Sequence, residues 1–420
     1  MTAAAIPGAA VARKDDRLGA FALFAAMLSA AGLPIYIHAP KFYVDNFGVG
    51  LTTSALVLFG LRLLDVLQDP ALGWLSERLG RRRGLAVACG AALMALAMVG
   101  LFAVTPPIAP LAWFALTLAL LFSGFSFLTI NFYAQGVAKA DSLGPTGHTR
   151  VAGWRETGAL LGICAAAVAP TALAGLGGGA FAVFAVGFAV LVVIASWAMR
   201  EEWSASLEAP AAGIGPILRD ALARRLLWIA LANATPVAVS STLFLYFVES
   251  RLGLPGWEGV YLLAFFLAAA LSAPIWSWLA ARFSPKPVLL TGMVLAILSF
   301  GGAATLGTGD ALAFAVICLA SGAALGADMT LLPAIFAGRM AQIAPRAAQG
   351  FGLWSFVSKF TLAFAAVLLL PVLEASGFQS GGTDNPASAL TTLTILYALL
   401  PCALKLIAIA LLIATPIKES

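Results

Sequence analysis

Three charged residues stand inside an otherwise apolar stretch, in the segment RLLDVLQDPALGWLSERLGRRR that runs from Arg62 to Arg83. Positions three and four apart share one face of a helix, so Arg62, Asp65 and Asp69 project from a single stripe that Gly73 continues. Two carboxylates one turn apart repel each other unless one is protonated or a cation lies between them. The pair is therefore a candidate site for a proton or for Na⁺, which prefers oxygen ligands. The alternative is an ion pair between Arg62 and Asp65 that only fixes helix packing, although it leaves Asp69 without a role.

A complementary charge lies far along the chain. Lys359, in GLWSFVSKFTLAFAAVLLL, is the only ionisable residue of a long apolar run. Because an unpaired lysine in such a run would tend to lose its proton, we expect its ammonium group to point at the two aspartates across a cavity. The alternative is that the side chain extends to the membrane edge and keeps its charge in water.

Other polar residues interrupt apolar runs elsewhere. In HTRVAGWRETGALLG, Arg155 offers a forked donor suited to a substrate oxygen, or it forms a gate pair with Glu156 at the inner mouth. For Asp328, in GAALGADMTLLP, we expect a role in packing or gating rather than in substrate contact. The segment SFLTINFYAQG supplies candidates for lining a cavity, although a polar stripe between packed helices would look the same; these candidates are Thr129, Asn131, Tyr133 and Gln135.

The elements that position these residues must cross a membrane. Of the 420 residues, 61% are hydrophobic and only 10% are charged, whereas soluble domains carry about 25% charged residues. A spanning helix needs about 20 mostly apolar residues. Twelve such runs are predicted, near residues 18–40, 50–75, 84–105, 109–138, 150–173, 178–199, 224–249, 256–281, 287–307, 311–338, 348–373 and 388–415.

Lys and Arg cluster in alternate loops, namely before the first run and after the second, sixth, eighth and tenth. Basic loops stay on the cytoplasmic side. We therefore expect a multi-pass protein of the cell membrane (inner or plasma membrane) with both termini in the cytoplasm. These loops also account for most of the basic residues behind the net charge of +5, so no nucleic-acid partner is expected.

The longest charged segment runs from Arg200 to Arg225 and separates six runs from six. We predict a six-helix bundle over 1–199, a cytoplasmic linker over 200–223 and a second six-helix bundle over 224–420. A weak internal echo supports this division: DPALGWLSERLGRRRG after the second run corresponds to SAPIWSWLAARFSPKP after the eighth. Two halves that rock around a central cavity are the plan of major facilitator carriers.

The sequence contains no P-loop motif, so the driving force is expected to be an ion gradient or the substrate's own gradient. The four cysteines lie within apolar runs and form no metal-ligand pattern. No cofactor is expected, and no metal beyond Na⁺ at Asp65 and Asp69.

These segments resemble a known family. FYVDNFGVGLTTSALVLFGLRLLDVLQDPALGWLSERLGRRRG is similar to the signature of the glycoside–pentoside–hexuronide cation symporters, the melibiose carrier family within the major facilitator superfamily. The resemblance continues at WRETGALLG, loosely at GADMTLLPAIF, and at WSFVSKFTLAFA. It implies twelve transmembrane helices in two bundles, and it implies the following roles: Asp65 and Asp69 as cation-site acids, Lys359 as the lysine of the eleventh helix, Arg155 as a substrate contact and Tyr133 as the aromatic residue of the fourth helix.

The sequence also departs from that family. Sugar-binding members hold a glycoside partly through acids in the first and fourth helices, whereas the matching positions here look like Ser29 and Thr129. Carboxylates grip hydroxyl groups more strongly than neutral acceptors do. The same family includes lysophospholipid carriers, which resemble the sugar carriers in the cation site rather than in the substrate acids. Ser29 and Thr129 remain candidates for the substrate site, Thr129 also for the cation site, and Trp354 joins the substrate candidates.

The sequence thus predicts a symporter that couples Na⁺ or H⁺ to a sugar, a glycoside or a related small solute by alternating access. Glu77 and Arg78 are expected in the inner gate, where charges pair across the two halves. The alternatives are a lysophospholipid or lipid-like substrate, an uncoupled facilitator or exporter, and a membrane scaffold or sensor. An enzyme is not expected, since the sequence has no nucleophile–base pair. We expect the protein to act as a monomer in the lipid bilayer.

Overall fold

The computed structural model describes residues 17–173, 179–204, 213–345, 347–379 and 385–417, and this part of the chain is helical with no β-strand. The first half contains α1 (Leu18–Ala30), α2 (Leu33–Phe47), α3 (Leu51–Leu79), α4 (Arg83–Phe102), α5 (Pro110–Asp141), α6 (Gly147–Ala172) and α7 (Ala180–Ala198). The second half contains α10 (Ala221–Tyr246), α11 (Glu258–Phe283), α12 (Pro285–Ala303), α13 (Ala311–Ile343), α14 (Ala348–Ala375), α15 (Ala387–Thr394) and α16 (Leu400–Ile413).

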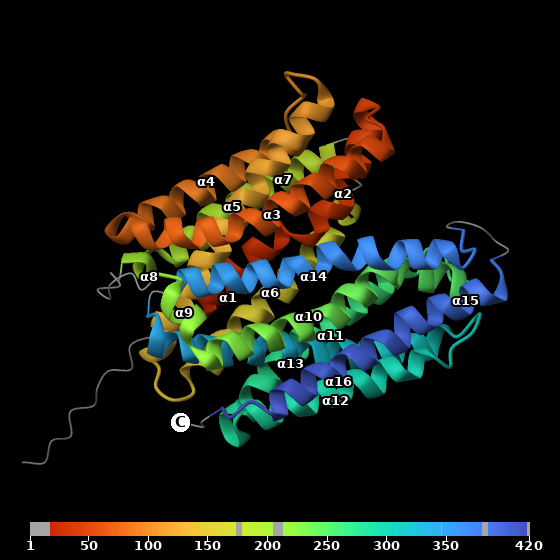
Figure 1. The fold of residues 1–420 in the computed structure, drawn as a ribbon. Helices are drawn as coiled ribbons and strands as arrows, with labels where there is room; N and C mark the ends of the chain where they lie inside the picture. The colour runs from red at the N-terminus through yellow and green to blue at the C-terminus, as the bar shows by residue number, and fades with distance from the viewer. Residues whose placement is uncertain (1–16, 174–178, 205–212, 346, 380–384, 418–420) are drawn as a thin grey trace, which may run out of the picture.

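Within the described residues, each of the twelve predicted spans coincides with one long helix or with helices that follow one another directly. In the part of the chain that the structure describes, eight helices are long and apolar enough to cross a membrane by length and composition. Figure 1 shows the long helices running roughly alongside one another in two groups, with α14 between them. The expectation of an all-α integral membrane fold is confirmed.

The first predicted span is wrong as a single helix. The chain leaves helical geometry at Gly32, where φ is −89° and ψ is −118°. Pro34 follows in the first turn of α2, where its missing N–H leaves no hydrogen bond unmade. The span is therefore two helices that together reach Phe47, seven residues beyond the predicted end at residue 40.

The last span also changes its winding. A π-helical turn, η4 (Ile395–Leu399), separates α15 from α16, and Pro401 lies at the start of α16. A proline cannot donate to the carbonyl four residues earlier, and one wider turn accommodates that loss. A similar turn, η3 (Phe247–Arg251), ends α10.

The segment predicted as a linker, residues 200–223, includes two short helices, α8 (Arg200–Ser204) and α9 (Gly215–Arg219). Residues 205–212 of that prediction lie outside the described part. The domain boundaries therefore stay a prediction.

The core of the described residues consists of three large buried clusters that mainly follow the two halves, and a small fourth cluster that joins α6 to α11 and α13. One cluster comes from α1 to α7 and is rich in phenylalanine and methionine. Two others come mainly from α10 to α16. Ile130, Ala134 and Val137 of α5 pack into one of these second-half clusters. The C-terminal half of α5 therefore joins the two halves.

Glycines bring the two halves together at one end of the molecule, the end that carries the basic turn after α3. A Cβ atom at Gly73 of α3 would lie 2.9 Å from the carbonyl oxygen of Ala348, and one at Gly352 of α14 would lie 2.8 Å from that of Asp69. A second close approach between the halves joins α6 to α11, where a Cβ at Gly153 would lie 2.7 Å from the Cβ of Ser277. The main chains approach closely only because these positions have no side chain.

Candidate ion and substrate site

An ion pair joins α3 to α14. Asp69 is completely buried, and Lys359 Nζ lies 3.0 Å from its Oδ2 atom and 3.2 Å from its Oδ1 atom. Ser355, one helical turn before Lys359, donates a hydrogen bond of 2.5 Å to Asp69 Oδ2. The two sides of the contact belong to different halves of the chain, so the pair links them.

The same lysine reaches the second aspartate. Lys359 Nζ lies 3.8 Å from Asp65 Oδ2 and donates a hydrogen bond of 2.6 Å to Ser126 Oγ on α5. Asp65 is 3% exposed, and its Oδ1 atom accepts a hydrogen bond of 2.9 Å from Gln68. The ammonium group of Lys359 thus lies against both acids and not at a membrane edge.

This arrangement is close to electrically balanced only while Lys359 is present. Two carboxylates and one ammonium group leave a formal charge of −1, and Arg62 is near enough to act electrostatically on Asp65. Removing one partner of a buried ion pair leaves a charge that is expensive to bury. If Lys359 moved away, the site would need another positive charge, which Na⁺ or a proton can supply.

A second polar cluster lies on α5 and α6. Arg155 Nε donates a hydrogen bond of 2.8 Å to Glu156 Oε1, and the Tyr133 hydroxyl donates one of 3.1 Å to the same oxygen. The Arg155 guanidinium carbon lies 3.7 Å from the centre of the Tyr133 ring. Arg155 Nη2 is buried and has no hydrogen-bond partner among the described residues. The sequence-predicted residues Arg155, Glu156 and Tyr133 therefore form one cluster.

A central cavity of about 450 Å³ is lined by Lys359 of the ion pair and by Tyr133 and Glu156 of the second cluster. Its volume is within the range of about 300–1,000 Å³ that is typical of small-molecule sites. Most of its wall is apolar. Its polar and aromatic lining includes Thr129, Tyr133, Glu156, Asn233, Ser241, Asp328, Trp354, Ser355, Ser358 and Lys359. Asp65 and Asp69 are not among the described lining residues, so Lys359 lies between them and the cavity.

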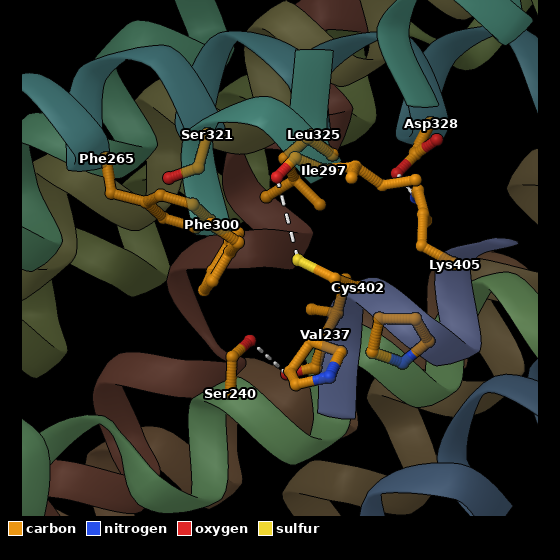
Figure 2. A pocket seen from close by; sticks show the side chains of 13 residues that line it. Val237, Ser240, Phe265, Ile297, Phe300, Ser321, Leu325, Asp328, Cys402 and Lys405 are labelled. Atoms are coloured by element: carbon orange, nitrogen blue, oxygen red, sulfur yellow. Dashed lines mark hydrogen bonds and ion pairs between the residues drawn. The ribbon is translucent and has the colours of Figure 1, made fainter. Parts of the chain in front are cut away.

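A third buried cluster involves Lys405, for which no role is expected from the sequence alone. Lys405 of α16 pairs with Asp328 Oδ2 of α13 and donates a hydrogen bond of 2.6 Å to Asn233 Oδ1 of α10. Lys405 is 3% exposed and Asp328 7% exposed. Figure 2 shows Asp328 and Lys405 turned toward each other at one end of a small side pocket, with Phe265 and Phe300 toward its other end. The sequence signal was that each is a lone intramembrane charge that needs an opposite partner.

Two residues expected to line the cavity do not. Asn131 is fully buried, and its Oδ1 atom accepts hydrogen bonds from Ser76 Oγ at 2.6 Å and from Arg83 Nε at 2.9 Å. The side chain of Gln135 donates to the Glu202 carbonyl oxygen at 2.7 Å. Both polar groups are used in contacts between packed helices, which is the alternative that the sequence left open for this stripe.

Ser29 is also absent from the described lining of the cavity. It lies three residues before the break between α1 and α2, and its carbonyl oxygen accepts a hydrogen bond of 3.1 Å from Gly32. The expectation that Ser29 contacts substrate is therefore not supported by this geometry.

The expected inner gate is present in part. Glu77 at the end of α3 accepts two hydrogen bonds from Gln349 of α14, one of 3.1 Å from the backbone N–H and one of 2.9 Å from Nε2. Arg78, by contrast, is exposed, with its guanidinium carbon 3.9 Å from the centre of the Trp74 ring on the same helix. Glu77 joins the two halves, whereas the described contact of Arg78 is with Trp74 of its own helix, and its pairing across the halves stays a prediction.

Comparisons with known proteins agree with this fold. The chain resembles the solved structure of a bacterial homologue of the iron transporter ferroportin in an outward-facing state, with 16% identity, a TM-score of 0.68, and 94% of this chain and 98% of that chain covered. It likewise resembles the fucose:proton symporter of E. coli, with 14% identity, a TM-score of 0.68, and 94% and 97% covered. At these identities the likeness shows the fold, which is that of major facilitator transporters.

One curated relative matches in sequence. This is the sodium-dependent lysophosphatidylcholine symporter 1 of Gallus gallus, with 26% identity over 165 residues, which are 38% of this chain. The matched part spans about a third of that relative's length, 31%.

The family comparison covers nearly the whole chain, since residues 19–419 match the family described as MFS/sugar transport protein. The match includes the twelve spans, the α3–α14 ion pair and the cavity. This multi-pass membrane protein therefore belongs to the MFS/sugar transport protein family.

Proposed function

We propose that this protein is a secondary transporter that couples Na⁺ or H⁺ to the symport of a sugar, a glycoside or a related small solute. The observation that carries the proposal is the position of Lys359, whose ammonium group lies between two buried aspartates of the other half and also faces the cavity. In this view the lysine is an internal cation that a coupling ion replaces.

The coupling step follows from the charges. With Lys359 in place, α3 and α14 are held together through Asp69 and Ser355. Binding of Na⁺ or a proton at the aspartates would supply the positive charge that Lys359 now provides and release Lys359 toward the cavity, where Ser358 and Trp354 also lie. If the ion raises the affinity for substrate, the substrate must raise the affinity for the ion by the same factor.

The end of the molecule where α3 and α14 pack closely, called the closed end below, indicates the side of the membrane from which the cavity is shut off. The Glu77–Gln349 contact and the Gly73 and Gly352 packing lie toward the basic turn that follows α3. Basic turns are cytoplasmic by the positive-inside rule. With both termini in the cytoplasm, the structure would represent a carrier closed toward the cytoplasm.

A lysophospholipid or another lipid-like solute is the second candidate substrate. The apolar part of the cavity wall, with Val237, Leu325 and Leu332 among its residues, would suit an alkyl chain, and the sequence match to a lysophosphatidylcholine symporter favours the same class. An uncoupled facilitator or exporter is the remaining alternative, in which the ion pair serves only as a contact between the halves.

Ion binding tests the coupling without knowledge of the substrate. Purified protein in lipid nanodiscs is melted in NaCl and in choline chloride at equal ionic strength, at pH 6 and at pH 8. A ligand that binds only the native state raises the melting temperature, so a saturable rise with Na⁺ supports sodium coupling, and a rise only at low pH supports proton coupling. A melting temperature that responds to neither ion would refute the coupling.

A further inference from the structure

A pair of tryptophan and arginine recurs near the ends of two helices, one in each half of the chain. Trp74 and Arg78 lie in the last two turns of α3, and Trp278 and Arg282 lie in those of α11. In both pairs the arginine follows the tryptophan by four residues, and both belong to the internal echo in the sequence. The duplicated segment therefore places the same two residue types at corresponding positions of the two halves.

In each pair the guanidinium group of the arginine lies near an aromatic ring. The Arg78 guanidinium carbon is 3.9 Å from the centre of the Trp74 ring. That of Arg282 is 5.8 Å from the centre of the Trp278 ring and 5.5 Å from that of Phe283. Stacking uses the face of a guanidinium group and leaves the N–H donors in its plane available. Within the described residues, neither arginine forms an ion pair or a hydrogen bond.

An exposed apolar stripe leads along each helix to its pair. Leu67 precedes Trp74 by two turns on α3, and Leu271 precedes Trp278 by two turns on α11; all four side chains are exposed. From Leu67 to Arg78 the helix rises about 16 Å, which is about half of a hydrocarbon core of roughly 30 Å. An exposed apolar stripe on a spanning helix faces lipid. Each stripe therefore suits the acyl region of one leaflet, and each arginine lies at the level of its headgroups.

A third pair of the same kind has its charge compensated. The Arg200 guanidinium carbon lies 4.3 Å from the centre of the Trp197 ring, but Nη2 of the same arginine lies 3.8 Å from Glu201 Oε1. That guanidinium group already has a carboxylate partner. The α3 and α11 pairs differ from it because no described acid balances their charge.

The chemistry of the α3 and α11 pairs narrows the class of ligand. A guanidinium group binds two oxygens of one phosphate through parallel N–H donors. Near the α3 pair, the Glu77 carboxylate is turned to Gln349 of α14, and Arg82 is exposed in the following turn. This basic surface attracts a headgroup of net negative charge. It repels the ammonium group that a zwitterionic headgroup would add.

We propose that Trp74–Arg78 and Trp278–Arg282 are two binding sites for anionic phospholipids, one in each half. Both helices end at basic loops, so the two sites lie in the same leaflet, at the closed end. In each site the arginine donates hydrogen bonds to the lipid phosphate, the tryptophan ring lies against the glycerol region, and an acyl chain follows the apolar stripe. The sites are independent of the substrate and of the coupling ion.

Native mass spectrometry of the delipidated full-length protein counts the lipids that remain bound at each lipid concentration. The probes are phosphatidylglycerol and phosphatidylcholine with identical acyl chains, so that only the headgroups differ. We expect the wild type to bind two molecules of phosphatidylglycerol about five- to tenfold more tightly than it binds phosphatidylcholine.

The variants assign the two bound lipids to the two sites. Arg78→Gln and Arg282→Gln should each weaken one of the two phosphatidylglycerol sites about five- to tenfold, and the double variant should weaken both. Trp74→Leu keeps an apolar side chain but removes the ring under Arg78, and it should weaken one site about two- to fivefold. The replaced side chains are exposed, so we expect the variants to fold, which thermal unfolding monitors.

Two further variants serve as matched controls. Arg82→Gln removes the same charge from an exposed position in the turn after α3, where the arginine stacks on no tryptophan among the described residues. Arg200→Gln removes an arginine that stacks on tryptophan but is paired with Glu201. Both proteins should bind two molecules of phosphatidylglycerol within twofold of the wild-type affinity.

Three outcomes would overturn the proposal. Equal weakening by Arg78→Gln and Arg82→Gln would indicate attraction by the charge of the whole basic turn instead of a defined site. Equal affinity for phosphatidylglycerol and phosphatidylcholine would contradict the anionic class, and a wild type that retains neither lipid would contradict both sites. Each result is read without Na⁺ and without substrate, so it is separate from the test of coupling.

Discussion

Lys359 Nζ lies 3.0 Å from Asp69 Oδ2 although 290 residues separate the two in the chain. The pair connects α3 of the first half with α14 of the second, and both side chains are shielded from bulk solvent. A contact of this kind serves two purposes: it supplies a counter-charge to a buried acid, and it holds the two halves of the chain in one relative position.

Neutralising Asp69 should abolish the response to the coupling ion. At a concentration of Na⁺ 100 times its dissociation constant, binding stabilises the wild type by about 2.7 kcal/mol, and Asp69→Asn should lose nearly all of that stabilisation because the site keeps only one acid. Thermal unfolding in NaCl against choline chloride measures the difference. Glu374→Gln, which neutralises an exposed acid on α14, should respond as the wild type does. A full Na⁺ response in folded Asp69→Asn would contradict the proposed site.

Removing Lys359 should make the protein depend on the ion. Lys359→Ala leaves Asp65 and Asp69 without their shared counter-charge, which lowers the free energy of unfolding by about 3 kcal/mol in Na⁺-free buffer. Added Na⁺ should restore much of that loss, since the ion can occupy the position of the ammonium group. Melting curves over a Na⁺ titration test this, with Lys359→Arg as the charge-retaining comparison. Equal destabilisation with and without Na⁺ would indicate a packing role only.

The glycine contact at the closed end should be sensitive to a single side chain. Valine at Gly352 would meet the carbonyl oxygen of Asp69 at 2.8 Å through its Cβ atom, so Gly352→Val should shift the population away from the conformation seen here. Cysteines placed at Glu77 and Gln349, whose side chains hydrogen-bond at 2.9 Å, report on closure through cross-linking, and the yield should fall several-fold. Gly187→Val on α7, where a Cβ meets no atom within 4 Å, is the control. An undiminished cross-linking yield would show that Gly352→Val does not separate α3 from α14 at this end of the molecule.

A salt bridge outside the membrane-spanning region should contribute to acid sensitivity. Hydrogen bonds from Arg339, with Nε at 3.0 Å, hold the pKa of the Asp220 carboxyl below its usual value of 3.8, and the same carboxyl caps α10 through a hydrogen bond of 2.7 Å from the Ala223 N–H. Because the folded-state pKa is depressed, the stabilisation is complete above the unfolded pKa and is lost as the pH falls through the lower folded value. The wild type should therefore lose more stability than Asp220→Asn between about pH 5 and pH 3. Parallel melting curves of both proteins over this range would refute the prediction.

The sequence was most informative where a charge stood alone in an apolar run. The cost of an unpaired charge in the membrane was enough to predict that Lys359 faces Asp65 and Asp69, and the distances agree. The same reasoning applied to Lys405 and Asp328 would have paired them, since each was the only charge in its run.

Other features depended on tertiary packing that a single sequence does not contain. Whether a polar residue of α5 faces the cavity or a neighbouring helix depends on small helix rotations, and Asn131 meets Arg83 and Ser76 whereas Thr129 meets the cavity. Arg78 offered the same charge as its neighbours in the basic turn, but its stacking on Trp74 became evident only from the structure. The break at Gly32 had a visible signal in the nearby Pro34, although a proline in the first turn is compatible with an uninterrupted membrane segment as well.

The close approach of α3 and α14 at Gly73 and Gly352 also affects how easily the carrier can change shape. Bare main-chain surfaces have no side chains that must leave interlocked positions or change rotamer before they part. Parting them at this end breaks the two hydrogen bonds that Gln349 donates to Glu77. We therefore expect this end to open and close reversibly, under the control of the charges around Asp69, which lies one helical turn before Gly73 on α3.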